Sequence, residues 1–255
     1  MRVLVTGLRG TLAPVLAARL RADGHEVIGW DRQALAVDDE FAGRAWLDAQ
    51  RPDAIAHLAT GDAHWAGWMA WWAAQGDRPF VFTSTAMVFD AQPDGPHQPA
   101  DTRTARDPYG RGKAVCEDAI RRAHPFASIA RLGWQIDLAR GGNTMLATLD
   151  RWQAEQGAIE ASRRWRPACS FLDDTVDVLA ELLHEPLPGV LHLDSNADEG
   201  WAFDRIARAL GAAAGRHHWQ VRSTEGYAHD QRLQGGALRL PPLSSRLPGL
   251  RPLPG

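Results

Sequence analysis

The one lysine of this chain, Lys113, follows Tyr109 by four residues, in the segment Tyr109-Gly110-Arg111-Gly112-Lys113. The sequence has 28 lysine and arginine residues, so all other basic side chains except histidine are arginines. Arginine is a planar fork that stays protonated, whereas lysine is a compact ammonium on a flexible stem. An amine kept at a single position of an arginine-rich chain therefore indicates a task that a guanidinium does not perform.

Tyr109 and Lys113 share one face if this segment is helical, because residues four apart are neighbours on a helix surface. An ammonium beside a phenol stabilises the phenolate, so we expect Lys113 to lower the pKa of Tyr109 toward neutrality. A tyrosine with such a pKa can donate or accept a proton during a reaction. A surface tyrosine–lysine pair without chemistry fits the same spacing equally well.

The composition is that of an ordinary globular protein and excludes several classes. A length of 255 residues suits one α/β domain or one domain with a small lobe. The net charge of −3 provides no basic field for nucleic acid. No apolar run is long enough to cross a membrane, and a strand begins at Arg2, so we expect no signal peptide and a cytoplasmic location.

Cysteine and histidine give no sign of a metal site or a disulfide framework. The two cysteines, Cys116 and Cys169, are too few for either, and the ten histidines have no metal-ligand spacing. We expect both cysteines to be buried free thiols in a reducing compartment.

The elements that must position the Tyr109–Lys113 pair alternate between short apolar runs and helical patterns. This alternation predicts an α/β fold, a Rossmann-type doubly wound parallel sheet with a small C-terminal lobe. Strands are expected over residues 2–6, 26–30, 53–57, 80–84, 127–132 and 190–193. Helices are expected over residues 11–22, 40–50, 62–75, 109–123, 143–156, 173–183 and 201–210, with a Pro- and Asp-rich loop over 90–107.

A glycine-rich loop follows the first predicted strand. Gly7 permits a tight turn there, Gly10 lets the backbone approach a pyrophosphate, and the small Ala13 lets the next helix pack on the strand. The N-terminus of that helix attracts phosphate. The second strand leads into Asp31, whose carboxylate can accept hydrogen bonds from ribose hydroxyls. This context predicts a dinucleotide site, although a tight turn without a ligand has a similar pattern.

Three charged residues bear on the choice of cofactor. Asp31 favours NAD, whereas Arg9 and Arg32 can both bind a 2′-phosphate. We favour NADP(H) slightly and keep NAD(H) as the alternative, because either arginine can also be a solvated surface residue.

Four segments complete a pattern that resembles a known family. They are Gly24–Arg32, Arg51–Ala59, Ser84–Asp90 and Tyr109–Glu117. With them the chain resembles the extended short-chain dehydrogenase/reductase family, and within it the dTDP-4-dehydrorhamnose reductases and NAD-dependent epimerase/dehydratase relatives. The likeness is strong over residues 1 to about 133 and weaker beyond.

The resemblance implies roles for individual residues. Thr85 would hydrogen-bond the substrate carbonyl, Tyr109 would donate the proton, and Lys113 would hold the nicotinamide ribose and lower the pKa of Tyr109. Hydride would come from the nicotinamide. The cofactor contacts implied are Gly7, Leu8, Arg9, Gly10, Asp31, Arg32, Leu58, Ala59 and Lys113.

The resemblance also implies a division into two domains, with some departures from the family. We expect an NAD(P)-binding domain over 1–133 and about 173–193, and a substrate lobe over about 134–172 and 194–255. The segment between Ala59 and Thr83 holds only one helix. Because that region forms part of the family's usual dimer interface, a homodimer is doubtful.

That single helix carries four tryptophans, of which Trp65, Trp68 and Trp72 fall on one face. We interpret them as a packed helix face or a subunit interface. An aromatic wall beside the nicotinamide or the substrate is the alternative.

The function expected is reduction of a keto group by NAD(P)H, on a nucleotide-linked sugar or a similar small molecule. An NAD-dependent nucleotide-sugar epimerase is the first alternative, because Thr85–Phe89 fits that pattern about as well. A cofactor-binding regulatory subunit without turnover is the second.

Overall fold

The computed structural model describes residues 1–250 and divides into two compact units. The first comprises residues 1–88, 105–131 and 176–191, and the second comprises residues 89–104, 132–175 and the chain from 192 onward.

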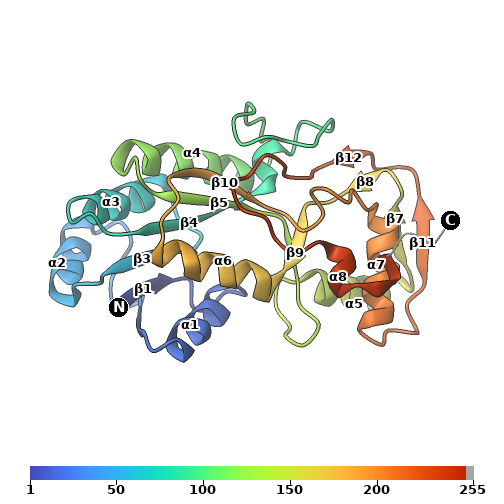
Figure 1. Ribbon diagram of the computed structural model, residues 1–255, viewed down its shortest axis with the longest axis horizontal. Coiled ribbons are helices and arrows are strands. Elements are labelled where there is room, and N and C mark those ends of the chain that lie inside the picture. Colours follow the sequence, from blue (N-terminus) through green and yellow to red (C-terminus); the bar gives the residue numbers. More distant parts are fainter. Residues whose placement is uncertain (251–255) are drawn as a thin grey trace. The chain divides into compact units, whose positions relative to one another are not determined.

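The first unit is built on a six-stranded sheet (Figure 1). Its strands are β1 (Arg2–Thr6), β2 (Glu26–Gly29), β3 (Ala54–His57), β4 (Phe80–Thr85), β5 (Ser128–Leu132) and β10 (Gly189–Leu193). Their order is β10-β5-β4-β3-β1-β2, and β1 pairs in parallel with both β2 and β3. The chain reverses its direction of travel across the sheet at β1, which makes a switch point between β1 and β3. The Rossmann-type parallel sheet expected from the sequence is confirmed.

Helices cover both faces of this sheet, with α3 and α4 on one side and α1 and α6 on the other in Figure 1. Their bounds are α1 (Ala13–Ala22), α2 (Glu40–Gln50), α3 (Ala63–Ala74), α4 (Pro108–Ala123) and α6 (Leu172–His184). Aspartates fix where three of them begin. Asp39, Asp62 and Asp107 each accept backbone N–H groups in the first turn of the helix that follows.

The tryptophans of α3 form part of the core of the first unit. Trp65, Trp68 and Trp72 are buried among residues of α2, β3 and β4, whereas Trp71 is partly exposed beneath the guanidinium of Arg44. The packed helix face expected from the sequence is therefore confirmed for the three buried tryptophans.

The second unit consists of helices and short paired strands. The helices are α5 (Met145–Gln156), α7 (Phe203–Ala213) and α8 (Leu243–Arg246), and the 3₁₀ turns are η1 (Ala86–Phe89), which begins in the first unit, and η2 (Pro248–Leu250). The strands are β6 (Trp134–Ile136), β7 (Ile159–Ser162), β8 (Trp165–Arg166), β9 (Cys169–Phe171), β11 (Val221–Thr224) and β12 (His229–Asp230). They pair as β6 with β9, β7 with β11 and β8 with β12. None of the six is predicted from the sequence, because strands of two to four residues contain at most two repeats of a period-2 pattern.

Residues 89–104 belong to the second unit, whereas the sequence analysis placed them in the first domain. The physical reason is backbone pairing with a distant segment. The N–H of His97 donates to the carbonyl of Arg232 at 2.8 Å, and the N–H of Gln234 donates to the carbonyl of His97 at 2.8 Å.

Candidate functional site

A cavity of about 570 Å³ lies at the carboxyl ends of β1, β2 and β3 in the first unit. Its volume is within the range of small-molecule and cofactor sites. Eight of the nine cofactor contacts expected from the sequence line it, namely Gly7, Leu8, Arg9, Gly10, Asp31, Arg32, Leu58 and Ala59. The ninth, Lys113, is not among the lining residues, and the role of all nine in binding remains a prediction.

Three further residues line this cavity that the sequence analysis did not select: Gly29, Trp30 and Thr60. Each lies within two residues of a selected residue. The rule that ligands bind beyond the carboxyl ends of parallel strands would have included all three.

The turn after β1 leaves room only for glycine. Gly7 has a φ of +84°, and a Cβ atom there would lie 3.0 Å from the backbone nitrogen of Ala59. The N–H of Gly10 donates to the carbonyl of Gly7 at 2.7 Å and closes the turn. No side chain caps α1, which begins just after this turn. The uncapped helix N-terminus and the close backbone approach both suit the phosphates of a dinucleotide.

The charged residues of the cavity differ in how they are held. Within residues 1–250 the Arg9 side chain has no hydrogen-bond or ion-pair partner. The guanidinium of Arg32 donates to the Thr60 carbonyl and lies 4.8 Å from the ring centroid of Trp65. One carboxylate oxygen of Asp31 accepts the N–H of Gln33 at 2.9 Å. Two cations and one partly engaged carboxylate therefore face the same space.

Helix α4 presents Tyr109 near its beginning and packs closely on the residues after β4. Asp107 accepts the N–H of Tyr109 at 2.8 Å and fixes the first turn. A Cβ atom on Gly110 would lie 2.3 Å from the carbonyl oxygen of Met87. Glycine at this position therefore lets α4 approach the end of β4, where Thr85 lies.

Thr85 and Tyr109 lie side by side, close enough for the Thr85 hydroxyl to act on the phenol. The pKa of Tyr109 is raised, because desolvation of the phenol outweighs the opposing effect of the Thr85 hydroxyl, although 46% of the residue is exposed. This corrects the expectation that Lys113 lowers the pKa of Tyr109. The ammonium of Lys113 lies 5.9 Å from the centroid of the Tyr109 ring and bonds elsewhere.

Lys113 is buried, with 6% of its surface exposed. Its ammonium donates to the Thr83 carbonyl at 2.7 Å and lies 4.5 Å from the centroid of the Phe82 ring. Burial lowers the pKa of Lys113 to about 8, and the neighbouring Cys116 and Glu117 side chains oppose this shift. The reading of Lys113 as an exposed surface lysine is therefore wrong.

No group of three or more His, Cys, Asp or Glu side chains within residues 1–250 is arranged to hold a metal ion. Cys116 and Cys169 are buried free thiols, as expected.

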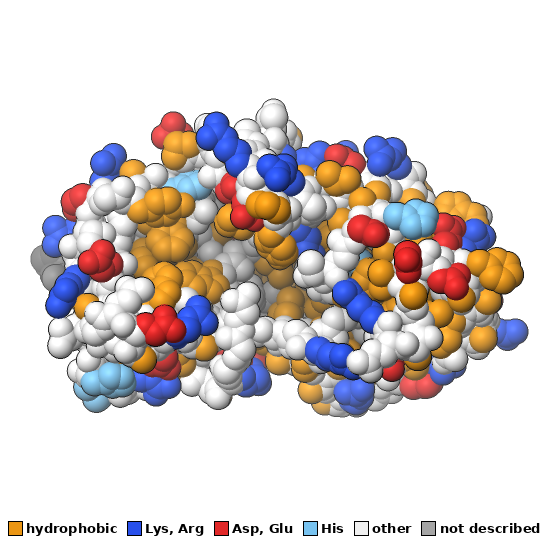
Figure 2. All heavy atoms as spheres, turned by 180° about the vertical axis from the view of Figure 1, so that it is seen from behind, with side chains coloured by type: hydrophobic (Ala, Val, Ile, Leu, Met, Phe, Trp, Pro, Cys, Tyr) orange, Lys and Arg blue, Asp and Glu red, His pale blue; other side chains and the backbone are white. Residues whose placement is uncertain are grey.

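No helix within residues 1–250 is long and apolar enough to cross a membrane. Charges of both signs are interspersed on the face shown in Figure 2.

Comparison with known families identifies the chain. Residues 62–234 match the model of the RmlD substrate binding domain family. The chain belongs to this family. The matched residues include Thr85, Tyr109 and Lys113 and extend through most of the second unit.

Individual relatives agree with this assignment. The dTDP-4-dehydrorhamnose reductase of Mycolicibacterium smegmatis is 29% identical over 243 residues, which cover 87% of this chain and 72% of the relative. A probable dTDP-4,6-dihydroxy-2-methyloxan-3-one 4-ketoreductase of Streptomyces antibioticus is 29% identical over 248 residues, covering 89% of this chain and 82% of the relative.

Solved structures share the fold. The dTDP-4-dehydrorhamnose reductase of Bacillus anthracis in complex with NADP superposes with a TM-score of 0.79 at 19% identity, covering 98% of this chain and 96% of that one. WbmH of Bordetella bronchiseptica in complex with NAD⁺ gives a TM-score of 0.76 at 17% identity, covering 96% of this chain and 95% of the other.

Proposed function

We propose that this protein reduces the keto group of a nucleotide-linked sugar with NAD(P)H. The observation that carries the proposal is the cluster of Thr85, Tyr109 and Lys113, in which a phenol, a neighbouring hydroxyl and a buried ammonium lie at the end of β4. β4 adjoins β3, whose following residues line the cavity, and both strands run in the same direction. The family and the named activities of the relatives support the same function.

The cavity residues fit a dinucleotide. The Gly7–Gly10 turn and the N-terminus of α1 would hold the pyrophosphate, and Asp31 or the arginines would hold the adenosine end. When bound, the nicotinamide supplies the hydride that is added to the carbonyl carbon.

The chain's own residues would bind and protonate the carbonyl oxygen of the substrate. The Thr85 hydroxyl would bond that oxygen, and Tyr109 would pass its phenolic proton to the oxygen as negative charge develops there. A raised phenol pKa keeps Tyr109 protonated before the reaction, in the form that a proton donor requires. Lys113 would place its ammonium beside the nicotinamide ribose.

We infer that NADP(H) is the preferred cofactor. Arg9 is unpartnered within residues 1–250, and Arg32 lies in the same cavity, so both guanidinium groups are placed to bind a 2′-phosphate. One oxygen of the Asp31 carboxylate already accepts a backbone N–H, so this carboxylate has less capacity to accept hydrogen bonds from the ribose hydroxyls.

The test is an assay with dTDP-4-dehydrorhamnose, the substrate that names the M. smegmatis relative, and NADPH. We expect the nicotinamide absorbance to fall in step with formation of the reduced sugar. Tyr109→Phe should lower turnover by about a hundred- to ten-thousandfold, because it removes only the proton donor. The cofactor affinity of this variant, measured by titration calorimetry, should be unchanged.

Two outcomes would contradict the proposal. Near-normal turnover by Tyr109→Phe would remove the assigned proton donor. A tightly retained NAD that never exchanges, together with an inverted rather than a reduced sugar, would indicate an epimerase instead.

A further inference from the structure

A buried ion pair lies beside the Thr85–Tyr109–Lys113 cluster in the first unit. Glu117, on α4, and Arg131, on β5, are joined by a two-pronged contact in which Nε donates to Oε1 at 2.9 Å and Nη2 donates to Oε2 at 2.8 Å. The exposed fractions of the two side chains are 1% and 3%. The hydroxyl of Ser84, the residue before Thr85, also donates to Glu117.

The pair connects every element that carries the cluster. Tyr109, Lys113 and Glu117 follow one another at intervals of four residues, so they form one stripe along α4. Three successive residues of β4 each contact a member of that stripe: Thr83 through its carbonyl to Lys113, Ser84 to Glu117, and Thr85 to Tyr109. Arg131 then fastens the stripe to the neighbouring strand.

Burial of two charges is costly, and replacing such a pair with apolar residues is often neutral or stabilising. Stability alone therefore gives little reason to keep this ion pair in the core. A fork of two parallel hydrogen bonds does, however, fix distance and angle more strictly than apolar packing. Catalytic groups need to be held within a fraction of an ångström.

We propose that Glu117 and Arg131 are positioning residues, which with Ser84 set the register of α4 against β4 and so the placement of Tyr109 and Lys113 relative to Thr85. This inference rests on the proposed function for its kinetic consequence. Its structural consequence for Lys113 does not depend on any substrate.

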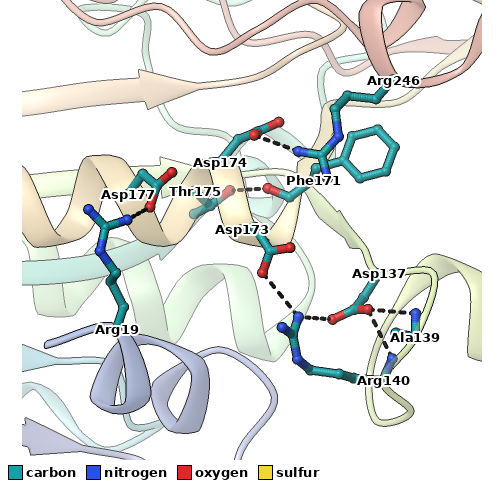
Figure 3. A network of polar contacts seen from close by, with 10 residues as sticks. All are labelled: Arg19, Asp137, Ala139, Arg140, Phe171, Asp173, Asp174, Thr175, Asp177 and Arg246. Carbon is teal, nitrogen blue, oxygen red and sulfur yellow. Dashed lines mark hydrogen bonds and ion pairs between the residues drawn. The ribbon is translucent and has the colours of Figure 1, made fainter. Parts of the chain in front are cut away.

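The experiment uses Glu117→Gln, which keeps the shape of the side chain and removes its charge. We expect kcat to fall about ten- to a hundredfold, with the dissociation constant for NADPH unchanged. Asp177→Asn is the matched control, because it removes one carboxylate from a solvent-exposed arginine ion pair of the same unit, the Arg19–Asp177 contact of Figure 3. The control should keep the wild-type kcat.

Lys113 provides a second measurement that needs no activity. It is the only lysine, so protein labelled with ¹³C at lysine Cε gives one lysine resonance whose pH titration reports its pKa. The ionisable groups that face it are Tyr109, Cys116, Glu117 and, from β3, His57. Loss of the Glu117 carboxylate should lower the pKa of Lys113 below that of wild type and of Asp177→Asn.

A folded Glu117→Gln variant with the kcat and the Lys113 titration of the control would overturn the proposal. If wild type reduces no nucleotide-linked keto sugar, the proposed function fails, and the positioning role is decided by a crystal structure of Glu117→Gln, in which Tyr109 and Lys113 should be displaced relative to Thr85. If Glu117→Gln does not fold, the double variant Glu117→Leu/Arg131→Met removes both charges of the ion pair and is judged by the same two measurements.

Discussion

Both units bury polar side chains, but they use them differently. In the first unit Lys113, Glu117 and Arg131 are buried on α4 and β5, and their neighbours include the hydroxyls of Ser84 and Thr85 on β4. In the second unit the buried Asp194 accepts hydrogen bonds from the backbone N–H groups of Cys169, Asn196 and Leu233.

A buried polar side chain therefore has a different role when its partners are other side chains than when they are backbone N–H groups. Side chains that meet side chains on regular elements form a group that can carry out chemistry. A side chain that collects backbone donors satisfies loops that no ladder of strands can satisfy. Figure 3 shows a similar arrangement at Asp137, whose carboxylate accepts the N–H groups of Ala139 and Arg140 as well as the Arg140 guanidinium.

The largest effect that would test this comparison is expected from Lys113→Arg. Turnover should fall at least about tenfold although the charge is kept, because the larger planar group does not fit between the Thr83 carbonyl and the Phe82 ring. Wild-type activity should decline as pH rises through about 8, where the ammonium loses its proton. Kinetics measured over about two pH units on either side of that pKa check both effects.

Lys113→Met is the control for Lys113→Arg, because it keeps the approximate volume and removes the charge. Wild-type turnover is expected to decline above pH 8. If Lys113→Arg kept, in that range, the turnover that wild type has at lower pH, positive charge alone would be the requirement and the fit of the ammonium would not matter.

A smaller effect, on stability, is expected from Asp194→Asn. The NH₂ group of the asparagine would face a backbone N–H, so two donors would meet and one hydrogen bond would be lost. The free energy of unfolding should therefore fall by about 1–3 kcal/mol. Cofactor affinity should not change. Urea unfolding and calorimetric titration with NADPH measure the two quantities.

The pH dependence of this effect has a definite sign. Burial raises the pKa of Asp194 to about 7 from 3.8, even though three backbone donors oppose the shift. Between these values the folded protein holds a proton that the unfolded chain has released, so this contribution to stability declines as pH rises toward about 7. Asp194→Asn should lack that slope, while Asp198→Asn, an exposed carboxylate paired with Arg239, should retain it. A slope unchanged in Asp194→Asn would assign it to other groups.

The smallest effect concerns the cofactor. Each charge-assisted contact is worth about 1.5–3 kcal/mol, but Asp31 repels a 2′-phosphate, so a net NADP(H) preference of only about tenfold is expected. Arg9→Ala/Arg32→Ala should erase the preference without weakening NAD(H) binding, whereas Arg21→Ala, an exposed arginine of α1, should leave it intact. Calorimetric titration of each protein with both cofactors measures the ratio. An unchanged ratio in the double variant would make Asp31 the deciding residue.

Much of the first unit could be predicted from local sequence patterns. The helix over 40–50 has the predicted bounds, and the strands that end at Thr6, Gly29 and His57 differ from prediction by a residue or less at each end. Apolar spacing reports these elements because their periodicity reflects which face is buried. The glycine turn and the four-residue spacing of Tyr109 and Lys113 are equally local.

What the sequence determined by itself is therefore the Rossmann-type sheet, the loop that closes on Gly7 and Gly10, and the helix that carries Tyr109 and Lys113. Tertiary structure alone decided that β7 pairs with β11, that residues 89–104 join the second unit, and that Glu117 meets Arg131. It also decided that the pKa of Tyr109 is raised. These features depend on burial and on contacts between residues far apart in the chain, and neither is encoded in a local period.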